Sequence, residues 1–180
     1  MKIERIDLCR LKIPLKQPYK IATAEMKTFD CTIVCLHSQR REGLGEAMAD
    51  IQGYFWETAD QVWRFAKEQG PKILGLQVEK ARDSISRHAK EMPCSVTPFL
   101  TALEMLNPKS LLAPPSQLIS VPMLGILQAT DPEGIRAEIE DFISRGYDTI
   151  KIKVGFDVDR DLERVKLAQE MIQGRAHLRA

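Results

Sequence analysis

The sequence predicts an α+β domain followed by a parallel α/β segment. Three observations support this fold class. Residues 1–50 have the patterns of strands and turns, residues 57–106 have those of helices, and strand and helix patterns alternate in the rest of the chain. The stretch "NPKSLLAPPSQ", residues 107–117, is rich in proline and serine and is typical of a junction. We therefore expect domains at 1–113 and 117–180.

The first domain opens with strands. "KIERIDLCRLKIPL" and "CTIVCLHS" alternate apolar and polar residues, and a turn at "RREG", residues 40–43, leads into "LGEAMA". This order predicts an antiparallel meander. Between the first two strands, "KQPYKIATAEMKTF", residues 16–29, is interpreted as a long loop, and loops of that length are often functional.

Helices follow the meander. "ETADQVWRFAKEQG" has Thr58 and Gln61 in a capping-box arrangement and ends at Gly70. "QVEKARDSISRHAKEM" is a weaker helix, and a third begins with Thr97 as N-cap and Pro98 as its first residue. The expected inner face of the first helix consists of Val62, Phe65 and Ala66.

The second domain alternates strands and helices. The strand "ISVPMLGILQA" precedes a helix that Asp131 caps, Pro132 enters and Gly146 ends. The strand "YDTIKIKVG", the helix "DVDRDLERVKLAQEMIQG" and the strand "AHLRA" complete the pattern. The expected inner faces of the two helices are Ile135, Ile139, Phe142 and Ile143, then Leu162, Val165, Ala168 and Ile172. Short connections predict parallel pairing with right-handed crossovers, in a segment far shorter than the about 250 residues of a complete (β/α) barrel.

Composition excludes several classes of partner. The net charge is +1, and the basic residues are scattered, so no nucleic-acid partner is expected. No apolar run approaches the roughly 20 residues that cross a bilayer, and the first ten residues lack the apolar core of a signal peptide. We therefore expect a cytoplasmic protein with no membrane partner.

The cysteines and histidines do not indicate a metal site. The cysteines are Cys9, Cys31, Cys35 and Cys94. They form no CxxC pair, so their spacing argues against zinc, and reduced, buried thiols are expected. The histidines, His37, His88 and His177, have no convincing ligand partners in the sequence.

Two lysines interrupt the strand "YDTIKIKVG", residues 147–155. Because side chains alternate along a strand, Lys151 and Lys153 share one face. The other face carries Ile150, Ile152 and Val154. Such a strand on its own is typical of a sheet edge protected from aggregation, but the flanking helix patterns favour a central strand. In an enclosed face, desolvation and a neighbouring cation lower the pKa of a lysine, which suits it to act as a base.

Four segments together resemble a known family. They are "MKIERIDLCRLKIPLKQPYKIATA", "GLGEAMADIQGYFWET", "TALEM" and "TIKIKVG". In this order they are similar to the N-terminal part of the enolase superfamily, in the mandelate racemase/muconate lactonizing enzyme family, with the muconate cycloisomerase/dipeptide epimerase branch most similar. The resemblance implies an enolase-like capping domain and the first strands and helices of a TIM-type barrel.

The resemblance also implies a chemistry. Such enzymes remove the proton next to a carboxylate, and Mg²⁺ stabilises the enediolate. Lys153 would be the base, and Lys151 would contact the carboxylate of a small substrate. Ile21, in the loop around 19–28, and Tyr54, in the loop around 51–56, would bind the substrate. A homo-oligomer is expected for the full-length form.

The family's three metal ligands follow the third, fourth and fifth barrel strands, and no residue here is assigned to that site. Asp157, Asp159 and Asp161 are interpreted as helix-start residues. The isolated chain is therefore expected to be inactive, as part of a racemase, epimerase or cycloisomerase whose reaction the sequence does not specify.

Two alternatives stay open. One is a non-catalytic remnant or binding module that keeps the fold without the metal. The other is an unrelated small α/β domain that binds nucleotides, which is disfavoured because neither GxGxxG nor GxxxxGK[ST] follows a complete strand.

Overall fold

The computed structural model describes residues 1–21, 24–49, 51, 55–112 and 117–180. It divides into two compact units. The first is Met1–Pro18 with Thr23–Ser116, and the second is Tyr19–Ala22 with Gln117–Ala180. Within the described ranges, no helix combines the length and apolarity needed to span a bilayer.

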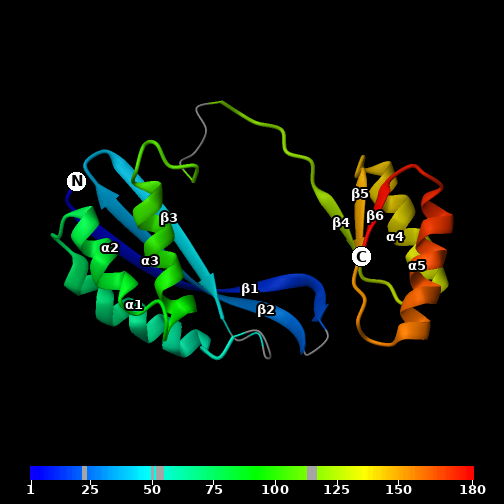
Figure 1. The fold of residues 1–180 in the computed structure, drawn as a ribbon, viewed down its shortest axis with the longest axis horizontal. Coiled ribbons are helices and arrows are strands. Elements are labelled where there is room, and N and C mark those ends of the chain that lie inside the picture. Colours follow the sequence, from blue (N-terminus) through cyan, green and yellow to red (C-terminus); the bar gives the residue numbers. More distant parts are fainter. Residues whose placement is uncertain (22–23, 50, 52–54, 113–116) are drawn as a thin grey trace. The chain divides into compact units, whose positions relative to one another are not determined.

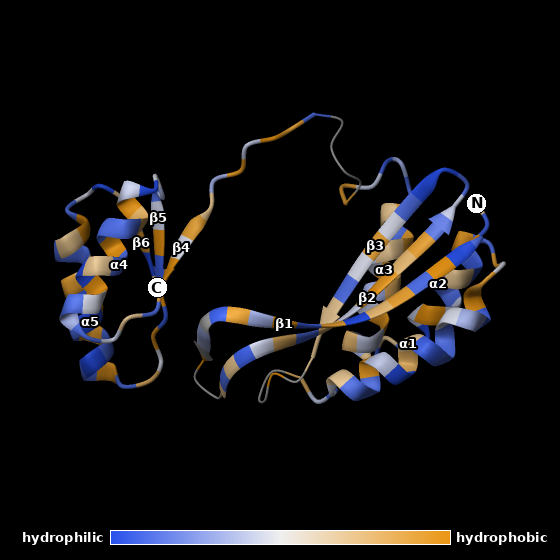
Figure 2. Cartoon of the chain, turned by 180° about the vertical axis from the view of Figure 1, so that it is seen from behind, coloured by the Kyte–Doolittle hydropathy of each residue, from blue (hydrophilic) through white to orange (hydrophobic). Residues whose placement is uncertain are grey.

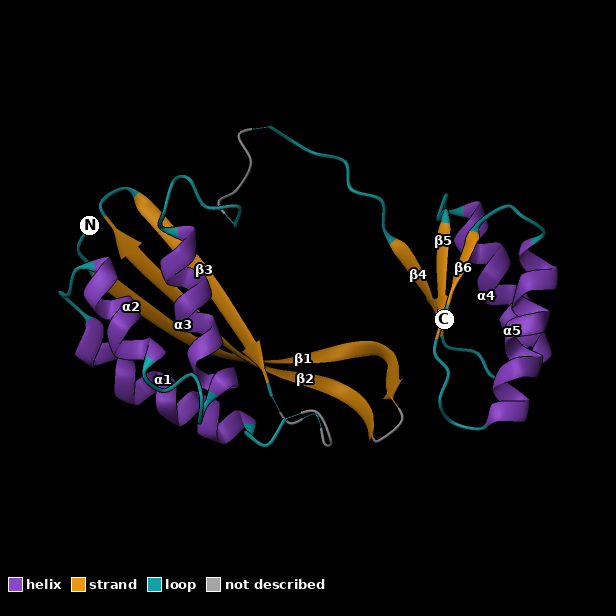
Figure 3. Ribbon diagram, in the orientation of Figure 1, coloured by secondary structure: helices purple, strands orange, loops and turns teal. Residues whose placement is uncertain are grey.

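The first unit is a three-stranded sheet with helices on one face (Figures 1 and 3). The strands are β1 (Arg5–Ile21), β2 (Ala24–Ser38) and β3 (Arg41–Met48), in the sheet order β1-β2-β3. The last residues of β1, from Tyr19 on, are grouped with the second unit. β2 and β3 pair antiparallel, as predicted for these two strands. The helices are α1 (Ala59–Ile73), α2 (Val78–Ser86) and α3 (Pro93–Met105).

Period-two alternation decides which face of this sheet is covered. Val34 and Leu36 of β2 are fully buried in the core beneath the helices. The intervening Cys35 and His37 stay on the opposite, more open face. Figure 2 shows the same alternation of apolar and polar residues along the strands. Of the predicted helical stripe, Val62, Phe65 and Ala66 are all buried.

The predicted loop at 16–29 is wrong. β1 and β2 continue through this segment on either side of residues 22–23 (Figure 1). A bidentate pair holds the two strands together, because Arg10 Nε and Nη2 donate to the two carboxylate oxygens of Asp30 at 2.7 and 2.8 Å. The turn lies at Gln39 and Arg40 instead of 40–43, with Gln39 in the left-handed region at φ 57°.

Three helix boundaries also differ from the prediction, and α2 ends at Ser86 instead of continuing to Met92. The capping box at Thr58 is confirmed, but α1 passes through Gly70 to Ile73. A Cβ built on Gly70 would lie 3.4 Å from Leu8 Cδ1, an ordinary contact distance, so Gly70 lies against β1 within the helix.

Helix α3 begins at Pro93 and not after Thr97. The buried carboxylate of Glu57 explains the earlier start. It accepts hydrogen bonds from the backbone N–H groups of Cys94 and Ser95, at 2.6 and 2.9 Å, and from the Ser95 hydroxyl. Glu57 therefore caps the helix from outside it, which a local pattern does not reveal.

The second unit is a parallel sheet with two helices on one face, shown in Figure 3. Its elements are β4 (Leu124–Leu127), α4 (Pro132–Ser144), β5 (Thr149–Ile152), α5 (Val158–Ile172) and β6 (His177–Arg179). Both strand pairs are parallel, as predicted, and β5 lies between β4 and β6. Of these described strands, the one carrying the lysines is therefore central.

The helices of the second unit cover an isoleucine-rich face. Ile150 and Ile152 of β5 are fully buried against apolar residues of α4 and α5. The prediction for Leu162 is wrong, since it is 52% exposed, and Asp161 is buried in its place. Val154 lies beyond the end of β5 and is also exposed, contrary to the prediction.

Candidate functional site

The lysine face of β5 is the candidate site. Lys151 lies within the strand and Lys153 directly follows its carboxyl end, and both are half-buried. Lys151 pairs in register with Arg179 of β6. Residues in register on neighbouring strands share a face, so a third cation lies beside the two lysines. In parallel βα folds, this carboxyl edge is where ligands bind.

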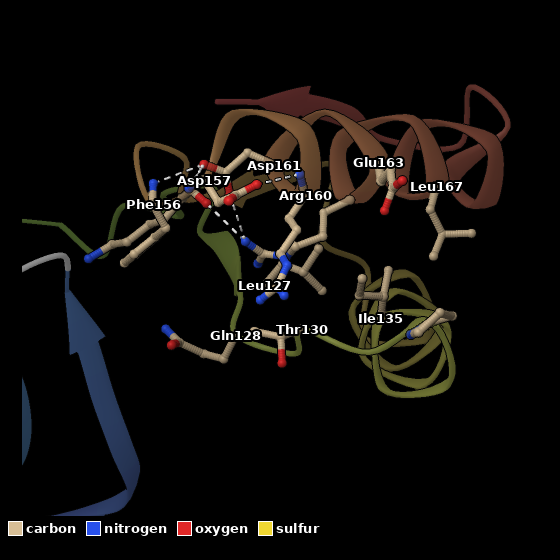
Figure 4. A pocket seen from close by; sticks show the side chains of 13 residues that line it. Leu127, Gln128, Thr130, Ile135, Phe156, Asp157, Arg160, Asp161, Glu163 and Leu167 are labelled. Atoms are coloured by element: carbon tan, nitrogen blue, oxygen red, sulfur yellow. Dashed lines mark hydrogen bonds and ion pairs between the residues drawn. The ribbon is translucent and has the colours of Figure 1, made fainter.

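A carboxylate fixes the loop that follows Lys153. Asp161 Oδ2 accepts a backbone N–H hydrogen bond from Gly155 at 2.7 Å. It also accepts from Phe156 at 3.0 Å and, at a longer distance, from Asp157, two residues that Figure 4 labels beside it. Hydrogen bonds from Phe156 and Gly155 hold the pKa of Asp161 below its ordinary value. Gly155 has φ +107°, a conformation that favours glycine.

Arg164 ties the ends of two strands together. Its Nη1 donates to the carbonyl oxygen of Lys153 at 3.3 Å, and its Nη2 donates to that of Ala129 at 3.2 Å. The Arg164 guanidinium also contacts the Asp161 carboxylate at 3.4 Å. These contacts orient the backbone that carries Lys153.

Tyr19 belongs to the second unit and contacts Lys153. Lys153 Nζ donates to the Tyr19 hydroxyl at 2.5 Å and lies 4.1 Å from the centroid of its ring. The sequence assigned Tyr19 only to a substrate loop. Ile21, at the end of β1, is half-buried, whereas Tyr54 lies outside the described residues.

A cavity of about 780 Å³ opens beside Lys153 within the second unit (Figure 4). Its lining combines cationic, acidic and apolar side chains: Leu127, Gln128, Thr130, Pro132, Ile135, Lys153, Phe156, Asp157, Arg160, Asp161, Glu163, Arg164 and Leu167. Lys153 lines this cavity, but Lys151 does not. The two predicted lysines therefore do not share this cavity.

The carboxylates near the strand ends do not form a magnesium site. Asp161 accepts from the loop backbone, Asp157 caps α5 at Arg160 N, and Glu138 accepts from the N–H groups of Gln128 and Ala129. Among the described residues, the cluster of ligand atoms suited to a metal lies in the first unit, at Asp7, Cys35 and His37. Its mixed donors differ from the oxygen set that Mg²⁺ prefers. The described residues near β5 therefore do not fit Mg²⁺.

No protein-family model matches the chain. Several curated proteins are similar to it in sequence. It is 27% identical to the N-succinyl-L-Arg/Lys racemase of Bacillus cereus, over 96% of this chain and 49% of that protein. It is 26% identical to the hydrophobic dipeptide epimerase of Enterococcus faecalis, over 96% of this chain and 51% of that protein. The chain spans about half the length of the curated relatives it matches.

Solved structures share the fold. The crystal structure of the N-succinyl Arg/Lys racemase from Bacillus cereus matches with a TM-score of 0.81 and 24% identity, over 99% of this chain and 51% of that one. A Methylococcus capsulatus dipeptide epimerase, complexed with Mg and the dipeptide L-Arg-D-Lys, matches with a TM-score of 0.81 and 22% identity, over 99% and 53%. The chain is a relative of the mandelate racemase/muconate lactonizing enzymes of the enolase superfamily. It has the N-terminal architecture of these enolase-superfamily proteins.

Sequence reasoning missed several residues that shape this enolase-superfamily fold. Glu57, Glu138 and Arg164 act on backbone groups far from them in the sequence, so no local motif marks them. Asp161 was recognised only as a helix-start residue. Its spacing from Gly155 is the signal that could have suggested a carboxylate folding back onto the preceding loop.

Proposed function

We propose that this chain supplies the proton-abstracting lysines of a racemase, epimerase or cycloisomerase that acts on a small carboxylate. Lys153 is the base, and Lys151 binds the substrate carboxylate. The observation that carries the proposal is Lys151 within central strand β5, between two buried isoleucines, with Lys153 directly after the carboxyl end of the strand. Kinship with racemases and epimerases supports it.

In the proposed reaction, the substrate carboxylate lies against the cations of Lys151 and Arg179. Lys153, as the neutral amine, then takes the proton from the adjacent carbon and becomes an ammonium group, and the electron pair of the broken C–H bond moves into the carboxylate to give an enediolate. The hydrogen bond from Lys153 to Tyr19 orients the amine. Asp161 and Arg164 act indirectly, by holding the loop and strand end that carry Lys153.

The proposed substrates are N-acylated amino acids or dipeptides. The names of the sequence relatives specify N-succinyl-arginine or N-succinyl-lysine and dipeptides. We propose that Ile21 and Tyr54 contact the substrate, that residues 1–113 form a capping domain, and that residues 117–180 begin a barrel. The whole protein would be a homo-oligomer.

The proposed Mg²⁺ would be held by carboxylates other than those described here. A related dipeptide epimerase is complexed with Mg, but the carboxylates near β5 already bind backbone groups. The 180-residue chain alone is therefore expected to be inactive.

The test follows exchange of the α-proton. The chain, and the longer product if its gene continues beyond Ala180, is incubated in D₂O with Mg²⁺ and N-succinyl-amino acids or dipeptides, and exchange is followed by proton NMR. We expect exchange only with the longer product. Lys153→Ala should reduce its rate on the order of 10²–10⁴-fold, the range for loss of a general base.

Lys166→Ala is the matched control, since Lys166 is an exposed lysine on α5. It should leave the rate unchanged, whereas Lys151→Ala should raise KM. Full exchange by the Lys153→Ala protein would contradict the assignment of the base. Absence of exchange from a folded longer product with every substrate would favour the alternative, a non-catalytic binding module.

A further inference from the structure

Four ligand-bearing side chains meet on the open face of the first unit's sheet. Asp7 comes from β1, Cys35 and His37 from β2, and Glu42 from β3, opposite His37 in the register. His37 Nε2 lies 2.7 Å from Asp7 Oδ2 and 3.3 Å from Cys35 Sγ. The ligand atoms of Asp7, Cys35 and His37 all lie within 4.8 Å of one another.

Arg5 lies over the contact between His37 and Asp7. Its Nη2 is 2.9 Å from His37 Nε2 and 3.4 Å from Nδ1, so it stands over the ring and not in line with the Nε2 lone pair. Asp7 Oδ2 lies 2.7 Å from His37 Nε2 and also accepts from Arg5 Nε at 3.1 Å. A cation in place of the proton on Nε2 would bind the ring nitrogen and the carboxylate together once Arg5 moved away.

We propose that Asp7, Cys35 and His37 bind a divalent transition-metal ion of the Zn²⁺ class. Nitrogen, sulfur and carboxylate oxygen are the donors that Zn²⁺ takes in proteins. Tetrahedral zinc places such atoms about 3.3–3.6 Å apart, so the distance from His37 to Cys35 already fits and that from His37 to Asp7 must widen.

Glu42 approaches the ring nitrogen of His37 that would not bind the metal. Its Oε1 lies 3.1 Å from His37 Nδ1. A carboxylate that accepts from Nδ1–H would fix the histidine tautomer and leave Nε2 free to ligate, as in carboxylate–histidine–zinc arrangements. Arg5 and Asp7 are exposed, so the arginine can move away without disturbing the core. The bound ion would link β1 to β2, with Glu42 of β3 supporting it.

The test is a calorimetric titration of the full chain with Zn²⁺, together with Co²⁺ absorption as a report of thiolate ligation. We expect one site, with a cobalt–thiolate charge-transfer band. Cys35→Ala should abolish this band, and Cys35→Ala and His37→Ala should each weaken Zn²⁺ binding more than about tenfold. Glu42→Gln should weaken it by about 10–100-fold, the usual cost of losing such a partner.

Cys9→Ala is the matched control, because Cys9 is an exposed thiol of β1 outside the cluster. It should bind as the unaltered chain does, and Arg5→Ala should bind more tightly. Excess Mg²⁺ should not displace Zn²⁺, which separates this site from the magnesium of the proposed function. Circular dichroism verifies that each variant folds. If a variant of Cys35 or His37 unfolds, the variants Asp7→Asn and Glu42→Gln, at exposed positions, test the site in its place.

Two results would overturn the site. The first is no saturable Zn²⁺ binding at about 100 μM by the folded chain. The second is equal binding by the unaltered chain and by folded variants of Asp7, Cys35, His37 and Glu42.

Discussion

At the scale of residues, single polar side chains fix the backbone around Lys153. The buried carboxylate of Asp161 accepts from three successive backbone N–H groups just after the lysine. Asp161 would be an exposed helix-start residue by pattern alone. The carboxylate is buried because it folds back onto the preceding loop. The loop's N–H groups would otherwise lack hydrogen-bond partners near the start of the helix.

Asp161→Asn should destabilise the second unit at neutral pH, because an amide accepts these hydrogen bonds less strongly and also brings N–H donors to the site. The folded-state pKa of Asp161 lies below its ordinary value of 3.8. Its contribution is therefore fully present above that value and is lost as pH falls through the lowered pKa. Urea midpoints measured from pH 7 to pH 2 should differ most at pH 7 and converge at the acid end. A constant difference across that range would contradict this assignment.

At the scale of elements, β3 and α3 approach unusually closely. A Cβ built on Gly45 would lie 1.8 Å from the carbonyl oxygen of Pro98, and one on Gly43 would lie 1.9 Å from that of Ala102. These glycines therefore let the helix lie directly against the strand. The sequence suggested only a turn at 40–43. A glycine needed for a turn cannot be distinguished in the sequence from one needed for close packing, because the helix that packs against it is not known.

Gly45→Ala should destabilise the first unit by about 1–3 kcal/mol or more, since overpacking forces the helix backbone to shift. Leu44→Ala, on the exposed side of the same strand, is the control and should change stability by less than about 0.5 kcal/mol. Urea unfolding followed by circular dichroism measures both. Equal midpoints for the two variants would show that the close approach is not a packing constraint.

At the scale of the whole molecule, the chain exposes a run of apolar side chains before β4. Leu118, Ile119, Val121 and Met123 are each at least two-thirds exposed. Among the described strands, β4 and β6 are the edges of the parallel sheet. Exposed apolar residues and open strand edges both favour association.

The isolated chain is therefore expected to self-associate. Sedimentation velocity over a range of concentrations should show species larger than a monomer. Leu118→Ser combined with Ile119→Ser should shift the distribution toward the monomer, because it removes part of the exposed apolar surface. A monomer at every concentration in the unaltered chain would contradict this expectation.

The sequence by itself determined the order and type of most elements, because hydrophobic period and caps are local. The cap at Asp131, the strand with Lys151 and Lys153, and the parallel pairing all follow from short-range patterns. Only the tertiary structure decided what depends on partners distant in the sequence. Glu57 extends α3, and the strands bring Asp7 and Cys35 to His37, a residue whose partners the sequence did not reveal. The reason is physical: periodicity specifies which face a side chain occupies, whereas sheet register and packing specify which side chains it meets.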